Sequence, residues 1–126
     1  MIYLTAEQVL FIHYRLVSQG GGQHGVRDLP ALQGALARPQ ARYDGQEVYT
    51  NIWWKCAVLF DGLLRNGPST SNNQPIAIAA AGLFLHLNGY RLIMDTEEMV
   101  TFTRSCAGKR PPLSEIALWF ERHARS

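Results

Sequence analysis

Apolar residues recur at helical spacing along most of the chain, and segments rich in Gly, Pro and polar residues separate the apolar stretches. This pattern predicts an all-α fold, a compact bundle of about six helices. The longest apolar run, residues 76–88, is hydrophobic nearly all round, which is typical of the central helix of a bundle. The polar segment 40–48 contains Asp44-Gly45, a turn signal, so a short flap hairpin is expected there.

Capping residues indicate where the helices begin and end. Thr5-Ala6-Glu7-Gln8 predicts a capping box, and Asp28 precedes a short helix with Pro30 in its first turn. Thr50 is the expected cap of the helix that leads into the central polar loop. The other expected boundaries are a stop at Gly20-Gly21-Gly22, a stop at Pro39, a stop at Asn88-Gly89, a second capping box at Asp95–Glu98, an end at Gly108 and a start near Ser114.

Each predicted helix has one face that should be buried. The residues expected to point inward are Val9, Ile12 and Leu16; Leu29, Leu32 and Leu36; Ile52, Cys56, Leu59 and Leu63; Met99, Phe102 and Cys106; and Leu113, Ile116 and Phe120.

Length and composition fit one domain over residues 1–126, because 47% hydrophobic residues are enough for a core. The net charge of +2 and the scattered arginines give no reason to expect a nucleic-acid partner. The run 76–87 is too short to span a membrane, which needs about 20 residues. Cys56 and Cys106 lie at apolar helical positions, and the N-terminus lacks a signal-peptide pattern, so we expect reduced, buried thiols in a cytoplasmic protein.

The polar loop between two apolar helices is the candidate site. It comprises Gly67, Pro68, Ser69, Thr70, Ser71, Asn72, Asn73, Gln74 and Pro75. Backbone N–H groups at the start of the following helix could bind an anion there, with Ser71, Asn72 and Asn73 as the candidate anion-binding residues. The loop holds no His, Asp, Glu or Lys, and Arg65 stands at its start.

The chemistry of an enzyme is not evident from these residues. Ser69, Thr70 and Ser71 are candidate hydroxyls, but nucleophilic catalysis also needs a base. Spacing selects none of the four histidines, which are His13, His24, His86 and His123. No spacing of His, Cys, Asp or Glu indicates a metal site.

Several stretches in a fixed order resemble a known family over nearly the whole chain, from about Leu4 to the last helix. They are Gly25-Val26-Arg27-Asp28, Ala35-Leu36-Ala37-Arg38-Pro39-Gln40, Tyr49 before a helix, Arg65-Asn66-x-Pro68, and the segment from Ala79 through Leu85-His86-Leu87-Asn88-Gly89 to Tyr90. The chain resembles the Doc (death-on-curing) branch of the Fic/Doc superfamily, also called Fido. The resemblance implies a helical bundle, descent from a toxin–antitoxin pair, and transfer of a phosphate or nucleotidyl group from ATP with Mg²⁺.

The active loop of the family has the form H-P-F-x-D-G-N-K-R-T-A, and this chain departs from it at most chemical positions. Gly67 stands at the position of the His that acts as general base, Ser71 at that of the acidic magnesium ligand, and Pro75 at that of the phosphate-binding Arg. The remaining correspondences are Pro68 (matching), Ser69 for Phe, Asn72 for Gly, Asn73 (matching), Gln74 for Lys, Ile76 for Thr and Ala77 (matching).

These departures lead to the expectation of a Doc-like protein that has lost the Fic motif. It would be a catalytically inactive pseudoenzyme that binds an antitoxin-like or other protein, with no metal and no cofactor. One alternative is a nucleotide-dependent transferase, moving phosphate or AMP to a protein hydroxyl, with altered active-site chemistry. Another is a decayed product that keeps only a stable fold.

Overall fold

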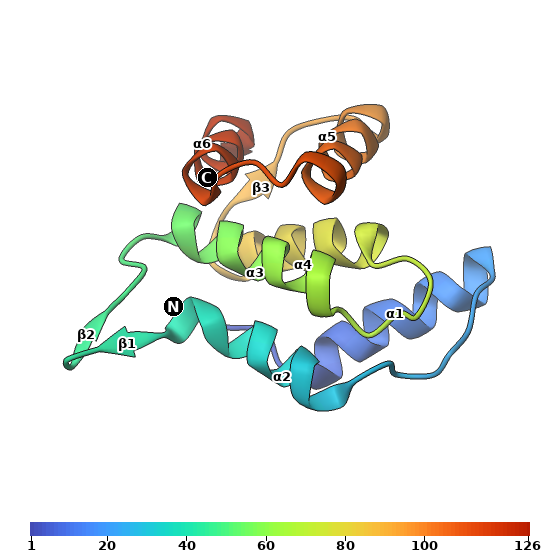
Figure 1. Ribbon diagram of the computed structural model, residues 1–126. Coiled ribbons are helices and arrows are strands. Elements are labelled where there is room, and N and C mark those ends of the chain that lie inside the picture. The colour runs from blue at the N-terminus through green and yellow to red at the C-terminus, as the bar shows by residue number, and fades with distance from the viewer.

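Six α-helices account for most of the computed structural model, which describes residues 1–126. They form three layers, with α3 and α4 in the middle, α5 and α6 on one side, and α1 and α2 on the other (Figure 1). The helices are α1 (Ala6–Gly20), α2 (Leu29–Ala37), α3 (Ile52–Asn66), α4 (Gln74–Leu87), α5 (Thr96–Lys109) and α6 (Leu113–His123). The predicted all-α class is confirmed.

Two helices, rather than one, form the centre of the bundle. The predicted central helix is α4, which buries six residues and contacts α1, α3 and α5. However, α3 buries eight residues and contacts α2, α4 and α6, so it is at least as central. The sequence hides this role because α3 carries Lys55, Asp61 and Arg65 among its apolar residues, whereas α4 is apolar nearly all round.

The predicted helix starts are mostly confirmed. Thr5 and Gln8 form a reciprocal capping box, with Gln8 N–H donating to Thr5 Oγ1 at 3.2 Å and Thr5 N–H donating to Gln8 Oε1 at 2.9 Å. Asp28 caps α2 through the N–H of Ala31 at 3.0 Å. The prediction for α3 was wrong by one residue, because Asn51, not Thr50, accepts the N–H of Trp54.

The helix ends show one further difference. Gly89, with φ of 95°, follows the end of α4 as predicted. The end predicted at Gly108 was wrong, because α5 continues to Lys109 and stops where Arg110 takes the left-handed conformation with φ of 49°. The last helix begins at Leu113, one residue before the predicted start near Ser114.

Two buried faces differ from the predicted ones. In α1 the fully buried positions are Val9 and His13, four residues apart, whereas Ile12 and Leu16 are only half-buried. In α2, Leu32 and Leu36 are buried as predicted, but Leu29 is 43% exposed and Ala35 is buried in addition. The hydrophobic pattern missed His13 because its imidazole is not counted as apolar.

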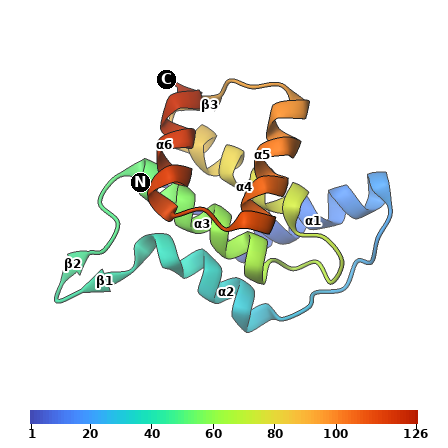
Figure 2. The same ribbon diagram turned by 45° about the horizontal axis from the view of Figure 1, so that its top comes forward.

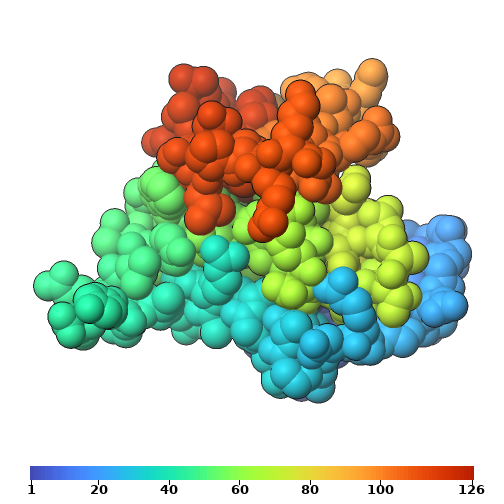
Figure 3. All heavy atoms as spheres, in the orientation of Figure 1, coloured from blue at the N-terminus to red at the C-terminus, as the bar shows by residue number.

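The predicted flap hairpin is present. Strands β1 (Arg42–Tyr43) and β2 (Gln46–Glu47) pair antiparallel around Asp44-Gly45, both of which have positive φ. A short 3-10 helix, η1 (Arg38–Gln40), precedes it, and the hairpin projects from the body at the left of Figure 3. A second pair, β3 (Arg91–Leu92) with β4 (Ala124–Arg125), joins the segment after α4 to the end of the chain.

None of the helices combines the length and the apolar character that crossing a bilayer requires.

Candidate functional site

The candidate loop connects the two central helices. Residues 67–73 form the connection, and Gln74 and Pro75 already belong to the first turn of α4. The loop passes beside the segment between α1 and α2, where the N–H of Arg27 donates to the carbonyl of Pro68 at 2.9 Å (Figure 1). The guanidinium of Arg27 also donates to the carbonyl of Arg65 at 2.7 Å. These two contacts hold the loop against the body of the molecule.

The hydroxyl of Ser69 organises the middle of the loop. It accepts the N–H groups of Ser71 at 3.2 Å and of Asn72 at 3.1 Å, and it lies 3.3 Å from the hydroxyl of Ser71. Ser69 is buried, whereas Ser71 and Asn72 are exposed. Two backbone donors that could bind an anion are therefore already bonded to a side chain of the same loop.

Asn73 closes the loop from the other end. Its Oδ1 accepts the N–H of Ser69 at 2.8 Å, and its Nδ2 donates to the carbonyl of Ser69 at 3.3 Å. Asn72 Oδ1 accepts the N–H of Gln74 at 3.1 Å, which satisfies one of the free donors at the start of α4. Anion binding by Ser71, Asn72 and Asn73 remains a prediction, and it would require an anion to displace these internal bonds.

Gly67 is buried and tightly enclosed. A β-carbon added at this position would lie 2.5 Å from Asn73 Oδ1 and 2.5 Å from the carbonyl oxygen of Leu63. Its φ of −68° and ψ of 170° suit any residue, so space rather than backbone conformation excludes a side chain. A histidine at position 67, where the resemblance places the family's base, would require the loop and Asn73 to move.

A cavity of about 260 Å³ lies between the loop and the C-terminal end of α1. His13 lines it together with Ser69, Ser71 and Asn72. The imidazole is only 2% exposed, and its Nε2 lies 3.1 Å from the carbonyl oxygen of Gly25. Of the four histidines, His13 is the one that lines this cavity, a role that its position in the sequence did not indicate.

The other three histidines have different surroundings. His24 packs against Tyr14 with ring centroids 5.2 Å apart, and His86 is exposed near the end of α4. His123 Nδ1 lies 2.7 Å from the carbonyl oxygen of Trp119 in its own helix. None of the three lines the cavity beside the loop.

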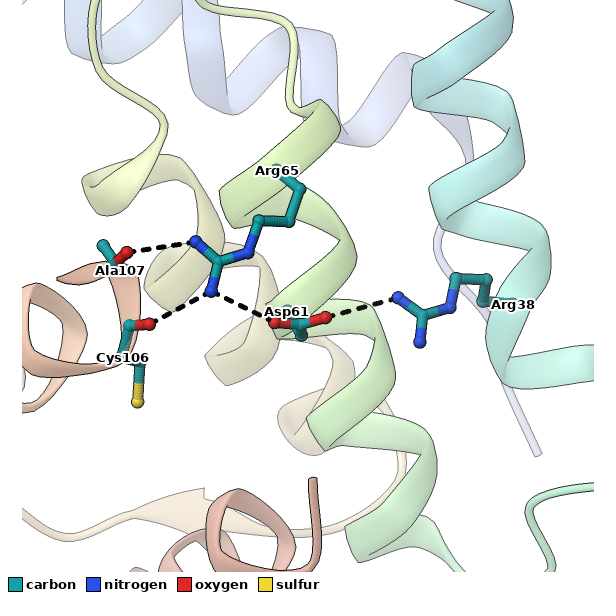
Figure 4. Close-up of polar contacts among 5 residues, drawn as sticks. All are labelled: Arg38, Asp61, Arg65, Cys106 and Ala107. Atoms are coloured by element: carbon teal, nitrogen blue, oxygen red, sulfur yellow. Dashed lines mark hydrogen bonds and ion pairs between the residues drawn. The ribbon is translucent and has the colours of Figure 1, made fainter. Parts of the chain in front are cut away.

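Arg65, the cation at the start of the loop, is directed away from it. Its guanidinium donates to the carbonyls of Ala107 and Cys106, each at 3.1 Å, near the C-terminal end of α5 (Figure 4). It also lies 3.6 Å from the carboxylate of Asp61, which contacts Arg38 at 3.4 Å on its other side. Arg65 therefore joins α3 to α5, and its guanidinium does not point into the loop.

Metal ligands and reactive thiols do not gather at the loop. No group of three or more His, Cys, Asp or Glu side chains comes together to hold a metal ion. Cys56 and Cys106 are both buried and free, as predicted. Burial raises the pKa of the Cys106 thiol to about 11, and burial also raises the pKa of Cys56. Both thiols are therefore protonated and unreactive near neutral pH.

The fold and the loop define a class of protein: a small helical bundle with a polar loop between its two central helices. No family model matches the chain. It is 44% identical over 75 residues to "Toxin Doc" from Mycolicibacterium smegmatis, which covers 60% of this chain and 58% of that protein. It is 26% identical over 117 residues to "Protein kinase doc" from Escherichia phage P1, which covers 93% of this chain and 91% of that protein.

These two matches confirm the resemblance of the chain to Doc proteins. The chain spans less than two thirds of the mycobacterial relative's length.

Proposed function

We propose that this protein is a member of a toxin–antitoxin lineage that acts by binding another protein and no longer transfers a phosphate or nucleotidyl group. The observation that carries the proposal is the enclosure of Gly67. A side chain at that position would meet Asn73 and the carbonyl of Leu63 at 2.5 Å, so the loop leaves no room for the base that the resemblance implies there.

Two further features support the loss of transfer. General-base catalysis contributes typically 10²–10⁴-fold to a rate, and Gly67 has no group that can accept a proton. Ser71 replaces a carboxylate that magnesium would favour, and Pro75 supplies neither a charge nor an N–H. Because phosphoryl transfer depends on positioning and charge neutralisation, we expect no use of ATP or Mg²⁺ by this chain.

The lineage is proposed from the relatives. One of them is named as a toxin and the other as a protein kinase. An antitoxin-like protein is therefore the first partner to seek for this chain. A reading frame beside the gene that encodes such a protein, and a stable complex between the two products, would support the proposed binding role.

A second candidate function is a nucleotide-dependent transferase with altered chemistry. The cavity beside the loop favours it, because His13 and the hydroxyls of Ser69 and Ser71 line the same space. In this candidate His13 would act as the base and the loop would bind phosphate. The internal bonds of Ser69 and Asn73 oppose it, because they occupy the donors and acceptors that a ligand would need.

Transfer from ATP distinguishes the two candidates. The purified protein is incubated with Mg²⁺, cell extract and ATP labelled in either the α or the γ phosphate, with the phage relative as positive control. We expect no labelled protein above the no-enzyme level in either arm, and no heat of MgATP binding by calorimetry. Label that disappears in His13→Ala and in Ser71→Ala, while both variants stay folded, would reject the proposal and support the altered transferase.

A further inference from the structure

Away from the candidate loop, α5 and α6 form the outer layer of the bundle (Figure 2). Residues of both helices line a groove on this layer. It consists of two hollows of about 500 Å³ and 260 Å³ that share Phe102, Ser105 and Trp119. We call it the α5–α6 groove. The helix α5 has 14 residues, so it is about 20 Å long at 1.5 Å per residue, which suits a short segment of a partner.

The floor of the α5–α6 groove is aromatic and firmly supported. The rings of Phe102 and Trp119 stack with centroids 3.4 Å apart and planes 1° from parallel. Phe60, in the core, stacks beneath Phe102 at 5.5 Å, and His123 lies 4.4 Å from Trp119. Phe102 and Trp119 remain half-buried, so part of this aromatic surface faces the solvent.

Carboxylates surround this aromatic floor. Asp95, Glu97 and Glu98 line the larger hollow, and Glu115 lines the smaller one with Lys109 as its single cation. Glu97, Glu98 and Glu115 are exposed and take part in none of the three ion pairs of the molecule. The Asp95 carboxylate caps α5 through the N–H of Glu98 at 2.8 Å. The groove is thus acidic in a chain whose net charge is +2.

We propose that the α5–α6 groove docks a basic segment of a partner protein. An apolar side chain, or the aliphatic stem of an Arg or Lys, of that segment packs against the exposed ring edges of Phe102 and Trp119, whose faces are covered by each other, Phe60 and His123. Neighbouring Arg or Lys side chains pair with Glu97 and Glu98. The excess of carboxylates disfavours nucleic acid and anionic lipid at this surface. The inference rests on the binding role in the proposed function, but not on the loss of transfer.

Peptide binding tests this inference. The probe is a 12-residue peptide with alternating Arg/Lys and Leu/Trp residues, and its control carries Glu at every basic position. Titrations into the ¹⁵N-labelled protein should shift the amide signals of Phe102 and Ser105 and the indole signal of Trp119 with the basic peptide only. The affinity should fall when salt rises from roughly 0.15 to 0.5 M, because exposed charges are screened.

Three variants of exposed residues define the site. The double variant Glu97→Gln/Glu98→Gln should lower the affinity for the basic peptide by roughly three- to tenfold, since each surface ion pair contributes little. Ser105→Arg places a cation where the two hollows meet and should abolish binding. Glu121→Gln is the matched control, because Glu121 is exposed on α6 and lines neither hollow.

Three outcomes would overturn the inference. These are equal binding of the acidic peptide, unchanged affinity in the Glu97→Gln/Glu98→Gln variant, or no binding of the basic peptide at millimolar concentration. Sedimentation that shows a dimer, dissociated by Ser105→Arg, would instead make a second copy of the chain the occupant and also reject a basic partner. The ATP-transfer assay tests the proposed function separately. If the protein neither transfers label nor binds the basic peptide, only the inference about the α5–α6 groove is rejected. If it transfers label and still binds the peptide, only the proposed loss of catalysis is rejected.

Discussion

Gly67 and Asn73 depend on each other at the scale of single residues. The side chain of Asn73 reaches back to Ser69 through the space that a β-carbon at position 67 would fill. Asn73 is buried, so its amide would be costly to leave without partners. The missing side chain and the closed loop are therefore one structural feature, and neither residue can change without affecting the other.

Gly67→Ala should therefore destabilise the protein, by about 1–3 kcal/mol, which is typical of overpacking. The measurement is the free energy of unfolding from urea titration. Gly108→Ala is the control, because a β-carbon at position 108, within α5, meets nothing within 4 Å. The control should be neutral or stabilising by about 0.5–1 kcal/mol, as for Gly to Ala in a helix. Equal stability of Gly67→Ala and the wild type would contradict the tight enclosure of Gly67.

The sequence could reveal what the loop lacks but not what the loop does instead. The absence of His, Asp, Glu and Lys between positions 66 and 75 is evident from the letters alone. The hydrogen bonds from the Asn73 side chain to the backbone of Ser69 are not evident from the sequence, because loop conformation depends on neighbours that are distant in sequence, such as Arg27. His13 was missed for the same reason: it reaches the loop only through the packing of α1.

At the scale of elements, a buried lysine connects the hairpin to the core. Lys55, on α3, is 2% exposed and donates to the carbonyl of Pro39 at 2.9 Å and to Glu47 of β2 at 3.0 Å. Its ammonium also lies 5.4 Å from the centre of the Tyr3 ring.

Caps and turn residues predicted the helices and the hairpin, because those signals are local. A hydrophobic pattern could not predict Lys55, because it excludes lysine from the core.

Lys55→Met should release the hairpin and change the pH dependence of stability. Burial lowers the pKa of Lys55, but the interactions with Tyr3 and Glu47 outweigh it and raise the pKa above 10.5. The stabilisation by the charged amine is then full below pH 10.5, the ordinary value, and is lost as the pH rises through the higher folded-state pKa. The free energy of unfolding of the wild type should therefore fall at alkaline pH, and this fall should be missing in Lys55→Met.

Two measurements check the Lys55 prediction. Urea unfolding between about pH 8 and 11 gives the pH dependence, and limited trypsin digestion after Arg42 reports the release of the hairpin. Lys109→Met is the control, since Lys109 is exposed and forms no ion pair. If Lys55→Met and Lys109→Met show the same digestion rate and the same pH profile, Lys55 does not hold the hairpin.

At the scale of the whole molecule, a continuous series of polar side-chain contacts connects the three layers. Arg38 in η1 pairs with Asp61 on α3, Asp61 pairs with Arg65, and Arg65 bonds two carbonyls of α5 (Figure 4). Arg65 thus connects α3 to α5, although it stands at the start of the candidate loop. Its Nε is buried without an acceptor, a cost that the bonds of the rest of the guanidinium must outweigh.

Arg65→Lys should lower the melting temperature despite keeping the charge. A lysine ammonium cannot reproduce the fork that reaches Cys106, Ala107 and Asp61 together. The missing charge-assisted bonds should lower the free energy of unfolding by about 1–2 kcal/mol. For a chain of this size, this corresponds to a melting temperature lower by roughly 3–8 °C. Calorimetry measures it, with the exposed Arg104→Lys as control. A melting temperature equal to that of Arg104→Lys would show that the fork contributes nothing.

The enclosure of Gly67 also determines how the proposed loss of catalysis can be tested. A histidine introduced alone at position 67 meets Asn73 and Leu63, so Gly67→His should destabilise the fold without creating activity. Replacing residues 67–77 as a block with the family's loop sequence keeps Asn73 but removes the bonds of Ser69 and Asn72 that hold the present conformation, so the loop and Asn73 are free to move away from position 67. We expect the block variant, and not Gly67→His, to bind MgATP by calorimetry and to label protein from ATP.

The same block with Ala at position 67 is the control for the base, and it should bind MgATP but transfer at least 10²-fold more slowly. This comparison separates the loop from its scaffold. A folded block variant that binds MgATP yet labels nothing would show that residues outside the loop have also diverged, with the hairpin held by Lys55 the first element to compare. A folded block variant that does not bind MgATP would contradict the expectation that the scaffold still presents an active-site loop.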